Sequence, residues 1–341
     1  MSRLSAAKRV EVCAHLVEQC SVRGTGRLCG VYKRTVTDLL VKLGLGCTRL
    51  HDRLVRGLPI WRIEVDELTA PVHTRQKNLP LDADPTWGHI WTYTAFATVS
   101  KLLVTFKHGK RTQDLTDAFM WDLRSRCTVI PELVSDGLAC YEAGVARSFG
   151  LACDYAQLVK TPSKKGKVSD VPFIRKRKVV GAPDMDRVST SYVERHNSTV
   201  RDQNRRFARK TRCHSKKIEN HVAQFALYAM WYNFVRIHDT IKTTPAVAAG
   251  IATAPWSLDE LVEAALGAEE APPLEPTPLR PREGETRAAR QLPGGGWLRV
   301  IDGGRTRPGL ASAPGAPKLK REPPVKPAPP RPMKQLDLFD L

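Results

Sequence analysis

Three acidic residues, far apart along the chain, have the types and placement that metal-dependent phosphate chemistry requires. Asp66 follows the alternating segment RIEV, Asp136 follows ELVS, and Glu194 lies near the start of a helix-like segment. They are separated by 70 (136 − 66) and 58 (194 − 136) residues. Carboxylate oxygens are ligands that Mg²⁺ favours. A pair of such ions, about 3.5 to 4 Å apart, activates a water or a 3′-hydroxyl and stabilises the departing oxygen. The three carboxylates therefore predict a site for two Mg²⁺ ions, with Mn²⁺ as a substitute, if the fold brings them together.

Each carboxylate also has a purely structural interpretation. The S-x-x-E motif ending at Glu194 matches a capping box, in which the glutamate closes a helix N-terminus. Asp136 precedes a glycine and fits an ordinary turn. Asp66 competes with Glu64 and Glu67 for any role. The prediction rests on the order of the three residues and on their joint placement.

The segments around the carboxylates predict a mixed α/β domain over residues 47–268. Apolar residues alternate in IWRIEVDEL, which predicts a first strand ending at Asp66. Two β-rich runs with a turn near residues 98–101 predict a hairpin. TQDLTDAFMWDLRSR has helical spacing, ELVSDG predicts a strand ending at Asp136, and CDYAQLV predicts a strand that further helices follow. This order is typical of an RNase H-like sheet, in which the first and fourth strands are neighbours and a later helix packs across them.

Residues 1–46 predict a helix-turn-helix domain. Val10, Cys13, Ala14 and Val17 have the spacing of one buried helical face, and Val36, Leu39, Leu40 and Leu43 repeat it. Between the two, Ser21 predicts the cap of a short helix and Gly30 predicts the turn that ends it. The following helix should begin near Lys33 and present Lys33, Arg34, Thr35 and Thr37 to a DNA major groove. The alternative is a small helical bundle that packs against the rest of the protein.

The charge of the chain favours a polyanionic partner. With 54 Lys and Arg against 35 Asp and Glu, the formal net charge is +19, and nucleic acid is the partner that such a balance indicates. Two basic runs, at residues 160–178 and 201–217, lie near Glu194 in the sequence and predict phosphate contacts, although a solvated charged face is the usual explanation of such runs. The candidate contacts are Lys164, Lys165, Lys176 and Arg177 in the first run and Arg201, Arg205, Arg206, Arg209 and Lys210 in the second.

The eight cysteines form no CxxC pair and predict reduced residues, mostly in the core. Cys47 and His51 have a spacing compatible with zinc, but ordinary packing is the favoured interpretation. His196, His214, His221 and His238 are expected to pack or to contact DNA rather than to catalyse. No apolar run approaches the roughly 18 to 20 residues of a membrane span. Since the N-terminus also lacks the pattern of a signal peptide, we expect a cytoplasmic, nucleoid-associated protein.

Several blocks together resemble the DDE transposases of bacterial insertion sequences. These blocks are RIEVDE, VSDG, STSYVERHNSTVRDQNRRFARKTRCHSKKIENH, YNFVRIH and TTPAVAAGI, within a resemblance that covers roughly residues 5–265. The resemblance implies an RNase H-like DNA strand-transfer enzyme with Asp66, Asp136 and Glu194 at the positions of the acidic triad. It implies double-stranded DNA, both element ends and target, as the partner, and a homo-oligomer by analogy. Relatives usually have an aromatic residue soon after the first aspartate-glutamate pair, whereas this chain reads DELTAPV.

Residues 269–341 predict a disordered, basic, proline-rich tail. Of the 25 prolines, 15 lie within residues 271–341, where large apolar residues are few. GGGWLRVIDGG, residues 294–304, favours a small hairpin with no assignable function. The chain ends with a peptide that resembles the motif by which bacterial replication and repair proteins bind the sliding clamp, the alternative being a chance apolar end. The residues of this motif are Gln335, Leu336, Asp337, Leu338 and Phe339.

Three functions are compatible with these features. A DNA transposase that cleaves element ends and joins the 3′-hydroxyl to target DNA is the favoured prediction. A catalytically silent, transposase-derived DNA-binding regulator and a metal-dependent nuclease without strand transfer are the alternatives. The sequence does not give the target preference or distinguish replicative from conservative transposition.

Overall fold

The computed structural model describes residues 4–161, 173–270, 272–273, 275–281, 290–291 and 297–298. The chain divides into one unit of residues 1–285 and a second of residues 286–341. Within the described part of the second unit, β7 (Arg290–Gln291) pairs antiparallel with β8 (Trp297–Leu298). Its first strand therefore precedes the 294–304 segment in which the sequence predicts a hairpin.

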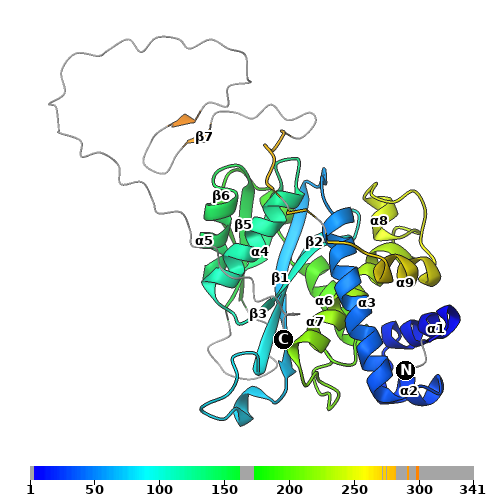
Figure 1. Ribbon diagram of the computed structural model, residues 1–341. Coiled ribbons are helices and arrows are strands. Elements are labelled where there is room, and N and C mark those ends of the chain that lie inside the picture. The colour runs from blue at the N-terminus through cyan, green and yellow to red at the C-terminus, as the bar shows by residue number, and fades with distance from the viewer. Residues whose placement is uncertain are drawn as a thin grey trace, which may run out of the picture. The chain divides into compact units, whose positions relative to one another are not determined.

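A mixed sheet forms the centre of the first unit (Figure 1). Its six strands are β1 (Arg62–Val72), β2 (Gly88–Ala97), β3 (Leu103–Gly109), β4 (Glu132–Asp136), β5 (Asp154–Thr161) and β6 (Phe173–Val180). Their order across the sheet is β3-β2-β1-β4-β5-β6. The strands β1, β4 and β5 are parallel, whereas β2, β3 and β6 run antiparallel to their neighbours. The first and fourth strands are adjacent, as the predicted RNase H-like arrangement requires.

Two features of the sheet differ from the prediction. Strand β6 occupies a segment where the sequence predicts helices, because an edge strand that pairs only with β5 tolerates the dense basic residues of FIRKRKVV. Asp66 does not end β1, which continues to Val72 because β2 pairs with it along this whole stretch. Pro71, in the segment that departs from the resembled family, lies in this pairing opposite His89.

Helices cover both faces of the sheet (Figure 1). The ring of Tyr93 on β2 contacts Phe119 of α4 (Gln113–Arg126) and Tyr141 of α5 (Ala139–Ser148). Phe96, three residues after Tyr93 on β2, stacks on His196 of α6 (Ser191–Gln203). Because neighbouring strand residues point to opposite faces, α4 and α5 lie on one face and α6 on the other. Helix α6 ends at Gln203, earlier than the helix-like sequence suggests.

Apart from the N-terminal helices, the other helices complete the layer on the α6 side or connect the strands. They are α7 (Ile218–Met230), the π-helix η3 (Trp231–Val235), α8 (Pro245–Ala248), α9 (Leu258–Leu266) and the short 3₁₀ turns η1 (Gln76–Asn78) and η2 (Met185–Arg187). Asn233 of η3 accepts a hydrogen bond from the amide of Leu103 at 3.0 Å and donates one to its carbonyl oxygen at 2.9 Å. The amide side chain thereby satisfies the backbone at the start of the edge strand β3.

The N-terminal helices are α1 (Ala6–Val17), α2 (Val22–Leu28) and α3 (Lys33–Leu54). Ser21 caps α2 and Gly30 has a φ of 65°, as predicted. The apolar face predicted for α3 is buried. The face predicted for α1 is wrong in part, because Val12, Cys13, Leu16 and Val17 are the buried residues. Val10 and Ala14 lie at the edge of that face and are only partly covered.

Helix α3 crosses residue 46, where the sequence predicts a domain boundary. It packs against α7 and α9, where a Cβ at Gly46 would lie 1.7 Å from the carbonyl oxygen of Ala265 and one at Gly44 would lie 2.3 Å from Cα of Ala223. Such a close approach requires glycine. The second half of α3 is therefore part of the main hydrophobic core, and the helix does not end at a linker.

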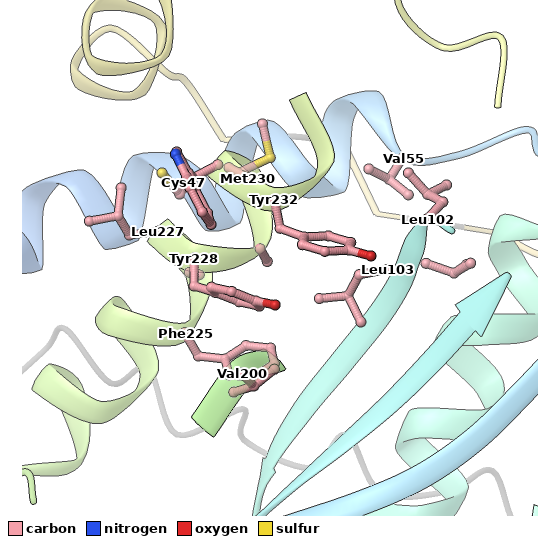
Figure 2. Packing of buried hydrophobic residues seen from close by; sticks show 14 of the residues in the cluster. Cys47, Val55, Leu102, Leu103, Val200, Phe225, Leu227, Tyr228, Met230 and Tyr232 are labelled. Carbon is pink, nitrogen blue, oxygen red and sulfur yellow. The ribbon is translucent and has the colours of Figure 1, made fainter. Parts of the chain in front are cut away.

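The main hydrophobic core extends over both faces of the sheet, and a large part of it lies between the sheet and the layer formed by α3, α7 and η3. Figure 2 shows Cys47 of α3 near Leu227, and Leu103 of β3 near the rings of Tyr228 and Tyr232. All five side chains are almost completely buried. At about 25 cal/mol per Å² of apolar area removed from water, this layer is a main source of stability for the sheet face that carries α6.

A buried ion-pair network fastens α3 to α4. The guanidinium of Arg126 is 1% exposed and contacts the carboxylates of Asp52 at 2.5 Å and Asp122 at 2.7 Å. It also donates to the carbonyl oxygen of Val55 at 2.7 Å. The buried guanidinium is thus paired on several sides, as a charge in a core must be.

Residues at the start of the predicted disordered tail pack on the first unit. Arg280 accepts a backbone hydrogen bond from the amide of Ile130 and donates one to the carbonyl oxygen of Thr128, both at 2.9 Å. Arg124 donates to the carbonyl oxygen of Thr277. The prediction of disorder from residue 269 is therefore wrong for this stretch, because backbone pairing offsets its low apolar content. Among the described residues, none of the helices has the length and apolar character of a membrane span.

Candidate functional site

The three predicted carboxylates line one open pocket of about 640 Å³, here called the carboxylate pocket. It forms at the point where the pairing of β1 with β4 ends, after Val65 and Ser135. Asp66 and Asp136 are the next residues of these strands, while Glu194 comes from the first turn of α6. The other lining residues are Arg111, Gly137, Leu138, Ala139, Leu158, Val159, Lys160, Asn197, Ser198, Arg201 and Arg209.

Asp66 is held by the helix that carries Glu194. Its Oδ2 accepts a hydrogen bond of 2.8 Å from Nδ2 of Asn197, three residues after Glu194. The Oδ1 of Asn197 in turn accepts a hydrogen bond from the Thr94 hydroxyl at 3.3 Å. Burial, followed by the charges of Glu67 and Asp136, raises the pKa of Asp66 to about 7. Asp66 is therefore a carboxyl group with little water around it and with two acidic neighbours, both of which disfavour its charged form.

Glu67 joins this group from the opposite face of β1. Carboxylate oxygens of Asp66, Glu67 and Asp136 all lie within 4.8 Å of one another. Glu67 also pairs with Arg111 and accepts a hydrogen bond of 2.8 Å from the Tyr141 hydroxyl. Burial and then Asp136 raise the pKa of Glu67. The sequence placed Glu67 among the competitors of Asp66 but could not show that both reach the same point.

Glu194 lies on the same pocket but has a cationic partner. Its Oε1 accepts hydrogen bonds from Nζ of Lys160 and, at 2.7 Å, from the Thr190 hydroxyl. Burial acts to raise the pKa of Glu194, but the bonds from Lys160 and Thr190 outweigh it and the net pKa is lowered. The capping-box interpretation of Glu194 is wrong, because Thr190 rather than Ser191 precedes α6 and the Thr190 side chain makes no capping hydrogen bond.

Glu64 has a separate task at the start of α6. It is buried, and its Oε2 accepts a hydrogen bond of 2.9 Å from the amide of Val193. A carboxylate at a helix N-terminus satisfies an amide that has no partner within the helix. Burial nevertheless raises the pKa of Glu64 to about 7. Glu64 thus fixes the first turn of α6 against β1. Its carboxylate is therefore not a candidate for the metal-binding role predicted for Asp66.

A second open pocket, of about 530 Å³, lies between the N-terminal helices and the segment that joins α6 to α7, and is here called the basic pocket. Of the predicted DNA contacts, Lys33, Arg34 and Thr37 line it together with Arg205 and Arg206. The other lining residues are Leu16, Cys20, Ser21, Val22, Arg23, Asp38, Arg212, Cys213, His214, Lys216, Asn220 and Gln224. Helix α3 begins at Lys33, as predicted, so the first turn of this helix forms one wall.

The cations of the basic pocket are poorly compensated. Asp38 is its single acidic lining residue, and that carboxylate lies 4.0 Å from Arg34. Burial lowers the pKa of Arg206 to about 10, and its guanidinium donates to the Ser215 hydroxyl at 2.9 Å. Within the part of the chain that the structure describes, the ion pairs include none of Arg205, Arg206 and Arg212. The pocket is therefore suited to an anion.

The other predicted DNA contacts are distributed differently. Arg201 and Arg209 line the carboxylate pocket rather than the basic pocket. Thr35 and Lys210 line neither. Lys176 donates to the carbonyl oxygens of Met185 and Asp186, and Arg177 pairs with Glu142. These last two side chains already have partners within the protein. Lys164, Lys165 and the terminal motif Gln335, Leu336, Asp337, Leu338 and Phe339 lie outside the described residues.

The predicted packing role of two histidines agrees with their surroundings. His196 stacks on Phe96 with ring centroids 4.9 Å apart, and His221 lies 4.5 Å from Phe207. Both are buried, and burial lowers the pKa of each. Cys47 and His51 are also buried, with Nε2 of His51 lying 3.3 Å from the carbonyl oxygen of Leu103. Such closed surroundings favour neutral packing groups over general bases.

No protein-family model matches the chain, and no curated protein sequence matches it. Among solved structures, a piggyBac transposase synaptic complex with hairpin DNA has 9% identity and a TM-score of 0.36, over 76% of this chain and 69% of that one. A simian T-cell lymphotropic virus intasome in complex with a PP2A regulatory subunit, B56 gamma, has 12% identity and a TM-score of 0.31, over 84% and 86%. A pre-cleavage Mos1 transpososome has 8% identity and a TM-score of 0.18, over 80% and 82%. Likenesses this distant do not establish a function for this chain.

Proposed function

We propose that the protein is a DNA transposase that cleaves element ends and transfers the 3′-hydroxyl into target DNA. The observation that supports this proposal is the carboxylate pocket, to which Asp66, Asp136 and Glu194 come from three separate elements. Cationic side chains surround the three carboxylates on the same pocket: Arg111, Lys160, Arg201 and Arg209. Acidic groups to hold divalent cations beside basic groups to hold phosphates are what a phosphodiester reaction needs.

The donor set fits hard divalent cations such as Mg²⁺ and Mn²⁺. Asp66 and Asp136 have carboxylate oxygens within 4.8 Å of each other and of Glu67, and the pKa of Asp66 is raised first by burial and then by the charges of these two neighbours. Asp66, Asp136 and Glu194 would hold the ions. When bound, two such ions activate the attacking oxygen and stabilise the leaving oxygen. Glu67 lies in the same group of carboxylates and would add to the negative potential of the pocket, since its charge raises the pKa of Asp66.

The residues of the pocket have distinct tasks in this proposal. Asn197 orients Asp66 through its amide, while Thr94 holds the amide. Lys160 neutralises Glu194 in the free protein and can turn to a DNA phosphate once a cation takes its place. Arg201 and Arg209 bind backbone phosphates on either side of the reacting one. None of these tasks requires a histidine.

We further propose that the basic pocket binds duplex DNA. Helices α2 and α3 are joined by a short turn at Gly30, as in a helix-turn-helix, and α3 would be the helix that enters the major groove. Arg205, Arg206 and Arg212 are positioned to bind phosphates of the same duplex. The 201–212 stretch thus contributes arginines to both pockets and would link recognition to cleavage.

The remaining partners in the proposal are other copies of the chain and the bacterial sliding clamp. Two element ends must be handled together, so an assembly of two or more copies is expected in the cytoplasm, on the nucleoid. The clamp proposal rests on the sequence of the terminal motif alone. A peptide of residues 330–341 should bind the bacterial clamp, and Leu338→Ala with Phe339→Ala should abolish that binding. Binding that is undetectable, or unaltered in the double variant, would refute the clamp proposal.

The transposase proposal is tested with purified protein, Mg²⁺ and DNA that carries the flanking terminal repeats. Asp136→Asn removes one metal ligand, and we expect it to reduce cleavage and joining by at least about a hundredfold while leaving DNA binding intact. The matched control is Asp202→Asn, because Asp202 is exposed on α6 and does not line the pocket.

Three outcomes separate the candidate functions. Joined products that disappear with Asp136→Asn support transposition. Cleavage without joining, lost in the same variant, would indicate a nuclease. Tight DNA binding without turnover in any protein would contradict both enzymatic functions and favour a DNA-binding regulator.

A further inference from the structure

A group of metal-binding side chains lies in the N-terminal helices, on elements other than those that form the carboxylate pocket. Glu11 and His15 are one helical turn apart on α1, and Cys29 is the residue at which α2 ends. Their carboxylate, imidazole and thiol atoms all lie within 4.8 Å of one another. A fourth side chain, Cys20 in the connection between α1 and α2, has its Sγ 3.9 Å from Nδ1 of His15.

With Zn–N and Zn–S bonds of about 2.0 to 2.3 Å, the ligand atoms of a tetrahedral zinc site are about 3.3 to 3.8 Å apart. The 4.8 Å limit for Glu11, His15 and Cys29 and the 3.9 Å between Cys20 and His15 exceed this range, so side-chain rotations would have to draw the four groups onto one ion. Lys8 contacts Oε2 of Glu11 at 2.5 Å, and a carboxylate has a second oxygen with which to bind a metal.

We propose that Glu11, His15, Cys20 and Cys29 bind one Zn²⁺ ion, which fastens α1 to the end of α2. Thiolate and imidazole ligands select zinc, whereas the all-oxygen carboxylate pocket selects hard cations such as Mg²⁺. The protein would then hold two kinds of metal site with opposite ligand chemistry. The zinc proposal stands on these four residues and does not depend on the proposed transposase activity.

An ion at this position would stabilise the short helix α2. Helix α2 has only seven residues and includes Gly24 and Gly26, each of which costs up to about 1 kcal/mol relative to alanine in a helix interior. A metal ion at its end would compensate by fixing Cys29 to α1. Cys29 is 5% exposed, so an ion bound there would be largely shielded from water. Zinc binding would displace the thiol proton.

Zinc content and thiolate ligation are the quantities to measure. The full chain is purified without a histidine tag, under reducing conditions, with Asp66→Asn and Asp136→Asn to exclude zinc from the carboxylate pocket. Metal analysis should give one zinc per chain. Replacement by Co²⁺ should produce a near-ultraviolet charge-transfer band, which only thiolate ligation gives.

Substitutions in this background identify the ligands. Cys20→Ser and Cys29→Ser should each abolish the cobalt band or reduce it in proportion to the thiolates removed. His15→Gln removes no thiolate and should instead lower the amounts of zinc and cobalt bound. The matched control is Cys140→Ser, since this thiol has intermediate exposure like Cys20 but lies on α5, outside the N-terminal helices. This control should retain full zinc and the full band.

The proposal fails if the reduced protein binds no zinc, or if Cys20→Ser and Cys29→Ser leave the metal content and the cobalt band unchanged. Should Cys29→Ser not fold, the wild-type cobalt spectrum and the Cys20→Ser variant still decide. Transposition assays have no part in this test, so its failure would leave the function of the carboxylate pocket untouched.

Discussion

The carboxylate pocket and the basic pocket are built in opposite ways. In the carboxylate pocket each carboxylate has a defined hydrogen-bond partner: Asn197 for Asp66, the amide of Leu138 for Asp136, and Lys160 for Glu194. In the basic pocket, Arg205 and Arg212 are exposed and Asp38 is the one acidic lining residue. Chemistry on one phosphorus atom requires fixed geometry, whereas attraction of a polyanion requires mainly charge. The difference fits the proposed division of tasks, in which the carboxylate pocket would act on DNA and the basic pocket would hold it.

We expect a residue that positions a carboxylate to matter much more than a neighbouring residue that only lines the carboxylate pocket. Asn197→Ala removes the amide that orients Asp66, and we expect a loss of roughly 10- to 100-fold in Mg²⁺ affinity or cleavage rate, as for other groups that orient metal ligands. The measurement is a Mg²⁺ titration of cleavage, with DNA affinity measured in parallel.

Ser198→Ala is the matched control for Asn197→Ala, because Ser198 is the next residue on α6 and also lines the pocket. It should cleave DNA nearly as well as the wild type. Equal loss in the two variants would show that Asn197 has no specific orienting role.

In the basic pocket, effects should be smaller and should depend on salt. Arg205→Gln and Arg212→Gln should each weaken duplex binding about equally for all DNA sequences, and each should reduce the slope of log affinity against log salt by about one. Fluorescence anisotropy at several salt concentrations measures both quantities.

Arg53→Gln makes the same change of charge at an exposed position near the other end of α3, outside both pockets. It should leave the salt slope unchanged. A slope change of the same size in Arg53→Gln would mean that net charge, rather than the basic pocket, governs binding.

The smallest expected effect is a pH dependence that belongs to the carboxylate pocket alone. The pKa of Asp66 is raised from 3.8 to about 7 in the folded protein, first by burial and then by Glu67 and Asp136. The native state therefore holds a proton that the unfolded state releases, so this contribution to stability is present below pH 4 and is lost as pH rises to about 7. Mg²⁺ should oppose the loss by binding the ionised form.

The relevant measurement is the free energy of unfolding of the wild type minus that of Asp66→Asn, between pH 4 and pH 8, because buried histidines and Glu64 contribute equally to both proteins. Without Mg²⁺ this difference should fall with pH, and with saturating Mg²⁺ it should fall less. A difference that is constant with pH would contradict the raised pKa.

Local sequence patterns predicted most elements but not all of their contacts. The hairpin of β2 and β3, the strand that ends at Asp136, the cap at Ser21 and the start of α3 at Lys33 all follow from short-range signals. Strand β6 was missed because its basic residues obscure the alternation that marks a strand. Its position at the sheet edge, which makes those residues acceptable there, is not a local property.

The sequence by itself determined the net charge, the periodicity of each segment and the three acidic residues that a shared site would need. Only the tertiary structure decided that Glu67 reaches the same point as Asp66 and Asp136, and that Glu64 instead anchors α6. Periodicity is set by neighbours three or four residues apart, so it can be seen in the sequence. Which side chains meet depends on strand register and on helix packing between segments tens of residues apart, and those are properties of the folded chain alone.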